Sequence, residues 1–351
     1  MSTTPTLFSP CQAGRRQAGL SLIELMISMV IGLLLLAGML SLIVGQSRSR
    51  AEIDKSGRQI ENGRYALTIL QDAIQHAGYY GQYSGVLSPL AALPDPCALD
   101  VASLDASLAM PLQGYDAPAS VPAPLSACLP DANHVAGTDI LVVRRLAAND
   151  APVAVANAIA GQVYVQTTPN AKITALGADP SPSTPTVYTL TKKDGATPAE
   201  LRPYVAHIYF VSPCNVYEAG LTTCSAAADQ GRPVPTLKRL ELTSSGGVMG
   251  FTTMPLVDGI QDLQFDYGVA VNNSGSPASP YITSPTVADW PNVMSVQVSL
   301  IARTTEPSAG YVDGKTYNLG VAGSTGPFSD TYKRHVYTAL VRAINPSSRR
   351  E

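Results

Sequence analysis

The side chains with the greatest chemical capacity are spread along this chain and form no known catalytic pattern. The four histidines are scattered, and neither an HExxH nor a GxSxG motif is present. Asp262 and Asp266 share one face of an expected strand, which predicts a solvated sheet edge. Asp313-Gly314 lies between two short runs of strand-forming residues and predicts a hairpin turn. We therefore predict no catalytic residue, no metal site and no cofactor.

Cysteine is the other reactive residue type, and its use indicates a disulfide framework. Cys11 lies near the start, whereas Cys97, Cys128, Cys214 and Cys224 lie in the later part. These four can pair in three ways, and proximity along the chain favours Cys97–Cys128 and Cys214–Cys224. No CxxC pair is present, which argues against zinc. Paired cysteines fit an oxidising compartment such as the periplasm.

One carboxylate, Glu24, lies inside the most apolar part of the chain. The 20 residues from Leu25 to Val44 carry no charge and would span ~30 Å as a helix, which is the hydrocarbon thickness of a bilayer. A secretory signal would have a shorter apolar region and a cleavage box of small residues. A carboxylate in lipid is costly and functional by default, unless Glu24 is solvated at the interface. Arg15 and Arg16 before this segment predict that the body after Val44 lies outside the inner membrane.

The residues around Glu24 carry a family resemblance. Gly19-Leu20-Ser21-Leu22-Ile23-Glu24, after a short basic leader, resembles the class III signal of type IV prepilins and type II secretion pseudopilins. Leu20 departs from the phenylalanine usual there. The segment 77–81, Ala-Gly-Tyr-Tyr-Gly, resembles minor pilins of the PilW family, as do the patterns at 259–268 and 334–345.

This resemblance implies processing and assembly roles for particular residues. A prepilin peptidase would cut between Gly19 and Leu20 and release leader 1–19 with Cys11, and Leu20 would be N-methylated. The new α-amine has an ordinary pKa near ~8 and is complementary to a carboxylate at the same depth. The resemblance implies that Glu24 pairs with the amine of a neighbouring subunit and so fixes its axial register.

The apolar pattern continues after the membrane segment as an amphipathic one. Ile53, Ile60, Leu67 and Ile74 recur every seven residues, and the helix is expected to end at Gly78. We expect a transmembrane and assembly helix over 20–45 and an amphipathic helix over 46–78. A sheet is the natural partner of the apolar stripe, and a free coiled coil is the alternative.

The remainder, 79–351, is expected to form a periplasmic β-rich globular domain with long loops. Alternating apolar residues separated by Pro, Gly and Ser clusters predict a series of strands. The expected strands cover 138–144, 162–167, 186–191, 204–211, 237–243, 259–269, 293–301 and 333–343. A long helix followed by strands in series predicts an α+β fold, type IV pilin-like, with an antiparallel sheet packed on the N-terminal helix.

Composition excludes some function classes. The 351 residues have a formal charge of −3, which becomes −5 when Arg15 and Arg16 leave with the leader. Without a basic excess, direct binding of nucleic acid is not expected. The mature length of 332 residues would make a bulky head, which suits a minor subunit.

We therefore predict a minor pilin-like structural subunit, not an enzyme, that is needed for the assembly or priming of type IV pili. Twitching motility and cell adhesion would follow from that role. The expected partners are the prepilin peptidase, other minor pilins, the major pilin and the inner membrane, and the resemblance suggests a large tip adhesin. The expected location is a single-pass inner-membrane form and then the pilus tip. A type II secretion pseudopilin is the alternative, and a membrane-anchored periplasmic enzyme is the alternative of another class.

Overall fold

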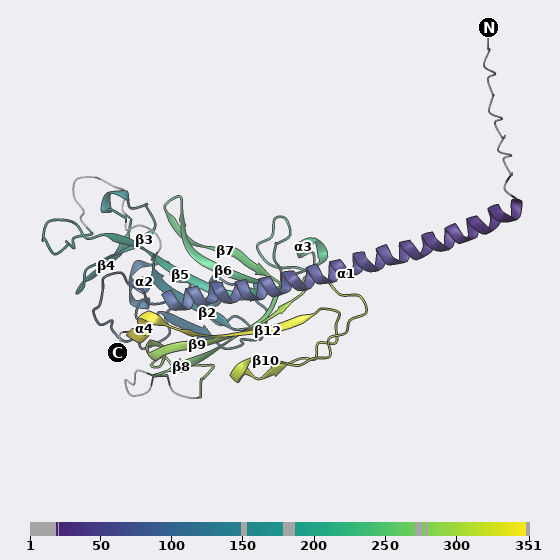
Figure 1. Ribbon diagram of the computed structural model, residues 1–351. Helices are drawn as coiled ribbons and strands as arrows, with labels where there is room; N and C mark the ends of the chain where they lie inside the picture. Colours follow the sequence, from purple (N-terminus) through teal and green to yellow (C-terminus); the bar gives the residue numbers. More distant parts are fainter. Residues whose placement is uncertain are drawn as a thin grey trace, which may run out of the picture. The chain divides into compact units, whose positions relative to one another are not determined.

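The structure is a computed structural model that describes residues 19, 21–148, 153–177, 187–270, 276–277 and 280–348 (Figure 1). Residues 1–18 of the expected leader, including Cys11, and the processing residue Leu20 lie outside the described residues. The chain divides into two compact units, residues 1–54 and 55–351.

Helix α1 covers Leu22–His76 as one α-helix. Its expected end is confirmed, because Gly78 takes a positive φ of 70° and its N–H donates to the Arg144 carbonyl at 2.9 Å. In the second unit, α1 packs on the body and is not a free coiled coil: Ala66, Leu70 and Ile74 are buried in the main core.

The body contains a seven-stranded antiparallel sheet in the order β1-β2-β5-β3-β4, in which β6 pairs with β5 and β7. The first strands are β1 (Leu112–Tyr115), β2 (Ile140–Leu146), β3 (Val163–Thr167) and β4 (Lys172–Leu176). The long strand β5 (Leu201–Ser212) pairs with β2 and with two further strands, β3 at its start and β6 at its end. The sheet is completed by β6 (Thr236–Ser245) and β7 (Val248–Asp258).

A second antiparallel sheet has the order β12-β9-β8, formed by β12 (Arg334–Arg342), β9 (Val293–Arg303) and β8 (Ile260–Val269). A short pair, β10 (Tyr317–Asn318) and β11 (Ser324–Thr325), lies in the loop between β9 and β12. The short helices are α2 (Val101–Ser107), α3 (Ala228–Gly231) and α4 (Ile344–Ser348). The predicted α+β fold, with a long helix and an antiparallel β-rich domain, is confirmed.

The main core lies where α1 meets both sheets. It joins Leu70 of α1 to Leu141 of β2, Val211 of β5, Phe265 of β8 and Val298 of β9. Alternation in β8 and β9 explains this, because every second residue of these strands is apolar and faces the core. The body therefore buries one face of α1 against two sheets.

The predicted position of the apolar stripe on α1 is wrong in its first half. Ile53 and Ile60 are 67% and 50% exposed. The buried positions instead begin at Gln59 and Gly63 and then include Ala66 and Leu70. These positions follow alternating steps of four and three residues, which is the spacing of a packed helix face. The first half of this packed face consists of small or polar residues. A prediction from hydrophobicity alone therefore misplaced the packed face of α1.

Most strand predictions are confirmed within two or three residues, and the exceptions have a common cause. The described part of the expected strand 186–191 forms only an isolated bridge from Thr191 to Pro198. Strands β4 and β7 were not predicted, because both lie at sheet edges and lack a clear apolar alternation. Whether such a segment forms a strand depends on its pairing with a neighbouring strand, and the hydrophobic pattern of the segment itself does not reveal that pairing.

Candidate functional site

Gly19, the expected processing residue, is the first described residue of the N-terminal motif. Gly19 is exposed, and among the described residues no heavy atom beyond its chain neighbours lies within 4 Å of the position that its Cβ would occupy. Leu20, the other residue of the expected cleavage bond, lies outside the described residues. An exposed glycine just before a helix is sterically accessible to a peptidase.

Glu24 closes a capping box at the start of α1. The Ser21 N–H donates to Glu24 Oε2 at 3.1 Å, and the Ile23 N–H donates to Ser21 Oγ at 3.3 Å. The Leu25 N–H donates to the Ser21 carbonyl at 3.1 Å, which begins the helical ladder. A Ser-x-x-Glu pattern satisfies amide groups that the first turn leaves unpaired. Glu24 thus has a local partner in this chain, and sequence reasoning did not anticipate it.

The segment that follows is apolar on all sides and exposed. From Leu22 to Val44 every residue except Gly32 is exposed, including Leu33, Leu34 and Leu35. This is the one helix among the described residues that is long and apolar enough to cross a membrane, by length and composition. A helix that is apolar all round requires an apolar environment, from lipid or from other helices. It therefore suggests a membrane-anchored protein.

In the second unit, α1 is held to the sheets by polar bonds as well as by apolar contacts. Gln59 Nε2 donates to the Ala302 carbonyl at 2.7 Å, and Asn62 Nδ2 donates to the Asp258 carbonyl at 3.0 Å. A Cβ at Gly63 would lie 2.6 Å from Cδ2 and Cζ of the Tyr337 ring. Glycine at this position therefore lets the Tyr337 ring lie directly against the helix.

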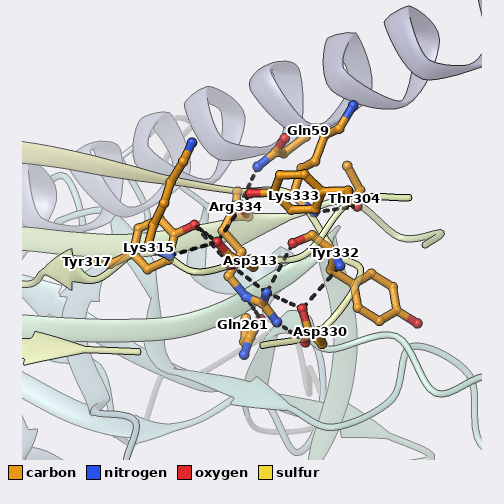
Figure 2. A network of polar contacts seen from close by, with 12 residues as sticks. Gln59, Gln261, Thr304, Asp313, Lys315, Tyr317, Asp330, Tyr332, Lys333 and Arg334 are labelled. Atoms are coloured by element: carbon orange, nitrogen blue, oxygen red, sulfur yellow. Dashed lines mark hydrogen bonds and ion pairs between the residues drawn. The ribbon is translucent and has the colours of Figure 1, made fainter. Parts of the chain in front are cut away.

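A buried ion network fixes the long loop between β9 and β12 (Figure 2). Arg334 begins β12, and its side chain is 1% exposed. Its guanidinium donates to Asp313 Oδ2 at 2.8 Å, to Asp330 Oδ2 at 2.5 Å and to Gln261 Oε1 at 2.7 Å. The Phe328 ring stacks on the guanidinium, with its centroid 4.0 Å away. The guanidinium thus joins two positions of this loop, Asp313 and Asp330, to Gln261 of β8.

The two carboxylates of this network stay ionised. The hydrogen bond from Arg334 lowers the pKa of Asp330. Burial alone would raise the pKa of Asp313, but hydrogen bonds from Tyr317 and Arg334 outweigh it and lower that pKa. The predicted hairpin turn at Asp313-Gly314 is wrong: Asp313 is fully buried and donates its N–H to the Asp330 carbonyl at 2.8 Å. A buried cation overrode the local turn preference.

The prediction that Asp262 and Asp266 lie on a solvated sheet edge is right about the edge and wrong about the exposure to solvent. Strand β8 is an edge strand, but Asp266 is only 1% exposed. The Val321 N–H donates to Asp266 Oδ2 at 3.1 Å, so the loop between β10 and β11 covers this carboxylate. Burial raises the pKa of both Asp262 and Asp266. A loop from 55 residues later decides this environment.

The four body cysteines form two disulfides, Cys97–Cys128 and Cys214–Cys224. These are the pairs that proximity along the chain favours. The second closes a short loop that Asp229 also braces, because its carboxylate accepts N–H groups from Asn215 and Val216 at 2.8 and 2.6 Å.

Within the described part of the chain, no three His, Cys, Asp or Glu side chains converge in an arrangement that could hold a metal ion. Arg334 and Asp313 form the most heavily bonded polar cluster around the helix and loop, and sequence reasoning did not identify them. In the sequence, Asp313 carried only a turn signal, and Arg334 lay just inside the last expected strand, 333–343.

Comparison with protein families decides the class of the chain. Residues 14–40 match the family model of the prokaryotic N-terminal methylation motif, and residues 221–345 match that of the type IV pilus-assembly protein W, PilW. Over these two regions the chain is similar to a PilW-like, prepilin-type protein. No curated protein and no solved structure matches it.

The two matches assign a minor pilin-like role in type IV pilus assembly. They point to a structural, non-enzymatic protein that interacts with other pilus components and is processed as prepilins are. The methylation motif covers Gly19 and Glu24, whereas the PilW match covers β6 to β12 and with them the Arg334 network. The two matched regions are thus most of the exposed apolar segment and the part of the body that holds the second sheet, which contributes to the core packed on α1.

Proposed function

We propose that this PilW-like chain is a minor pilin that primes the type IV pilus and stays near its tip. The observation that carries the proposal is the methylation motif, with an exposed Gly19, followed by an apolar helix segment. From Leu22 to Val44 the side chains of this segment are exposed, apart from Gly32, and the bonds that they make to other described residues are local. Such a surface is suited to lipid first and to the helices of other pilins afterwards.

Cleavage between Gly19 and Leu20 would change the electrostatics around Glu24. The new α-amine, with an ordinary pKa near ~8, would be a cation four residues from the carboxylate. In an assembled filament the Glu24 carboxylate would pair with the amine of a neighbouring subunit. Pairing relieves the cost of two isolated charges in an apolar medium, and it holds only at one axial position.

The body of the mature chain supports a terminal position in the filament. It carries two disulfides, which close loops, and two main sheets with ten strands in total, and these sheets pack on the long helix α1. A head of this size is easier to accommodate at the end of a filament than at every position along it. Partner minor pilins, the major pilin and a large tip adhesin would meet this head, and loss of twitching and attachment would follow from its absence.

Mass analysis of the mature N-terminus tests the export class. We expect a first residue of N-methyl-Leu20; a chain that still begins at Met1 in cells with active prepilin peptidase contradicts the proposal. Deletion of the gene should abolish surface pili and twitching while protein secretion continues. Loss of type II secretion with normal pili would instead identify a pseudopilin.

Substitution of Glu24 tests its role separately from export. Glu24→Gln keeps the amide acceptor for the Ser21 N–H but removes the charge, so it should leave insertion and cleavage intact. If the charge pair contributes about 1.4 kcal/mol or more to docking, incorporation falls tenfold or more. Glu24→Asp, which keeps the charge, is the matched control. Normal incorporation of Glu24→Gln would remove the carboxylate from the mechanism.

A further inference from the structure

A groove of about 490 Å³ lies beside α1 and is lined by residues of α1, of the loop after β9 and of β12. Its apolar surface comes from Ile60 of α1, which is 50% exposed, and from the rings of Tyr311 and Tyr337. Its cationic surface comes from Lys315 and Lys333, and His335 adds a polar imidazole. The groove therefore combines an apolar floor with basic side chains.

The positive character of the groove has a structural cause. None of the described residues that line it is acidic. The two nearest carboxylates of the network, Asp313 and Asp330, are engaged by the Arg334 guanidinium at 2.8 and 2.5 Å. Figure 2 shows the Lys315 side chain extending away from this network on the side where α1 lies. The network has two carboxylates for one guanidinium and so a net charge of −1, and the two lysines of the groove, Lys315 and Lys333, bring the region to a net charge of about +1.

The shape of the groove depends on contacts that the sequence does not suggest. The Tyr337 ring lies against Gly63, and burial raises the pKa of its phenol, which stays neutral. The Tyr337 hydroxyl is buried and has no hydrogen-bond partner among the described residues. Gln59, beside Ile60, is fixed by its bond to the Ala302 carbonyl at 2.7 Å. These contacts make a rigid wall, and a rigid site binds with a smaller loss of conformational entropy.

Charge and shape together select the occupant. A free phosphate would not use the apolar floor. A nucleic acid needs many phosphate contacts, whereas this groove offers two lysines and a histidine on an acidic body. An amphipathic segment with Asp or Glu on one side and apolar residues on the other complements both surfaces.

We propose that this groove binds an acidic amphipathic segment of a neighbouring pilus subunit. The inference rests on the proposed function, because it assigns the groove to contact inside a pilus assembly. Ile60, which would otherwise be an unexplained exposed residue beside the packed face of α1, then becomes part of an interface.

Charge reversal in the full chain tests the proposal. Lys315→Glu with Lys333→Glu is expressed in cells that lack the wild-type gene. Lys192→Glu with Lys193→Glu makes the same charge change on an exposed segment far from the groove in sequence. Pili are counted, and membrane insertion, cleavage and the thermal midpoint of the purified chain are measured. We expect a tenfold or larger loss of pili for the groove variant and none for the control.

A neutral variant keeps the test decisive if charge reversal disturbs folding. Lys315→Gln with Lys333→Gln should keep the thermal midpoint within about 2 °C of the wild type and lower pilus number two- to fivefold. A normal number of pili in a folded, processed Glu or Gln variant overturns the proposal. If deletion of the whole gene leaves pili unchanged, the proposed function fails instead, so the two failures are distinguishable.

The occupant is identified by selecting suppressors that restore twitching to the Lys315→Glu, Lys333→Glu cells. Substitutions of Asp or Glu by Lys or Arg in another pilus subunit are expected, and they should not restore a strain deleted for this gene. Suppressors confined to lipid synthesis genes would identify a membrane surface as the occupant and overturn the proposal.

Discussion

The contact between Gly63 and Tyr337 gives a sharp test of how α1 is held to the body. Gly63→Ala adds one methyl group whose Cβ would lie 2.6 Å from two atoms of the Tyr337 ring. Gly57→Ala is the matched control, because it lies in the same helix and nothing is within 4 Å of its Cβ position. The two substitutions share the same change in chemistry and differ only in the space available.

The expected magnitudes follow from two opposing effects. Replacing glycine by alanine inside a helix contributes about 1 kcal/mol of stability. Overpacking a filled contact costs about 1–3 kcal/mol, because the ring must move or the helix must shift. Gly57→Ala should therefore raise the free energy of unfolding by up to about 1 kcal/mol, and Gly63→Ala should fall about 1–3 kcal/mol below it.

Denaturant unfolding of the full chain in detergent, followed by tyrosine and tryptophan fluorescence, measures both values. A double variant, Gly63→Ala with Tyr337→Ala, separates the clash from other effects of the methyl group. In the Tyr337→Ala background, Gly63→Ala should become as stabilising as Gly57→Ala. If Gly63→Ala equals Gly57→Ala in the wild-type background, the Tyr337 ring is not held against α1 and our account of the groove wall is wrong.

Three further predictions concern the body and use the same unfolding assay. Leu70→Ala, at a fully buried position of α1, should cost about 2–5 kcal/mol, whereas Leu340→Ala, at a 63% exposed position of β12, should cost under about 0.5 kcal/mol. Arg334→Met should lower stability by about 3 kcal/mol or more, because Asp313 then remains buried without its cation; Asp313→Asn in the same chain should recover part of the loss. Burial raises the pKa of Asp139 to about 7 and lowers the pKa of His207 to about 3. Between pH 4 and 6.5 the folded chain therefore holds a proton on Asp139 that the unfolded chain has largely lost, so acidification stabilises the fold through Asp139. Over the same range the unfolded chain gains a proton on His207 that the folded chain does not, so acidification destabilises the fold through His207. Asp139→Asn should remove the first effect and make the unfolding midpoint fall more steeply from pH 6.5 to 4.5 than in the wild type; an unchanged slope would refute these assignments.

The N-terminal part of this chain was predictable because its signals are local. The positions of Gly19 and Glu24 before 20 uncharged residues are visible in the sequence, and membrane thickness gives that length a meaning. The processing and pairing roles of Gly19, Leu20 and Glu24 remain predictions. The capping bond from the Ser21 N–H to Glu24 also follows a local pattern, Ser-x-x-Glu, and is therefore a feature that the sequence itself carries.

The body was predictable only where its strands alternate strongly. In β8 and β9 every second residue is apolar, and both strands were found within two residues. Strand β7 lacks that alternation, and it becomes a strand because β6 pairs with it over ten positions. The packed face of α1 was misplaced because Gln59 and Gly63, which face the body, are not hydrophobic.

The sequence by itself therefore determined the class of the chain, the anchor, the α+β order and the favoured disulfide pairs, since these depend on residue type and short spacing. Only the tertiary structure decided that Asp313 pairs with Arg334, that a loop covers Asp266, and that Ile60 is exposed beside two lysines. These features join residues that lie 21 to more than 200 positions apart. Burial and charge at such sites depend on which distant segments pack together, and no local pattern carries that information.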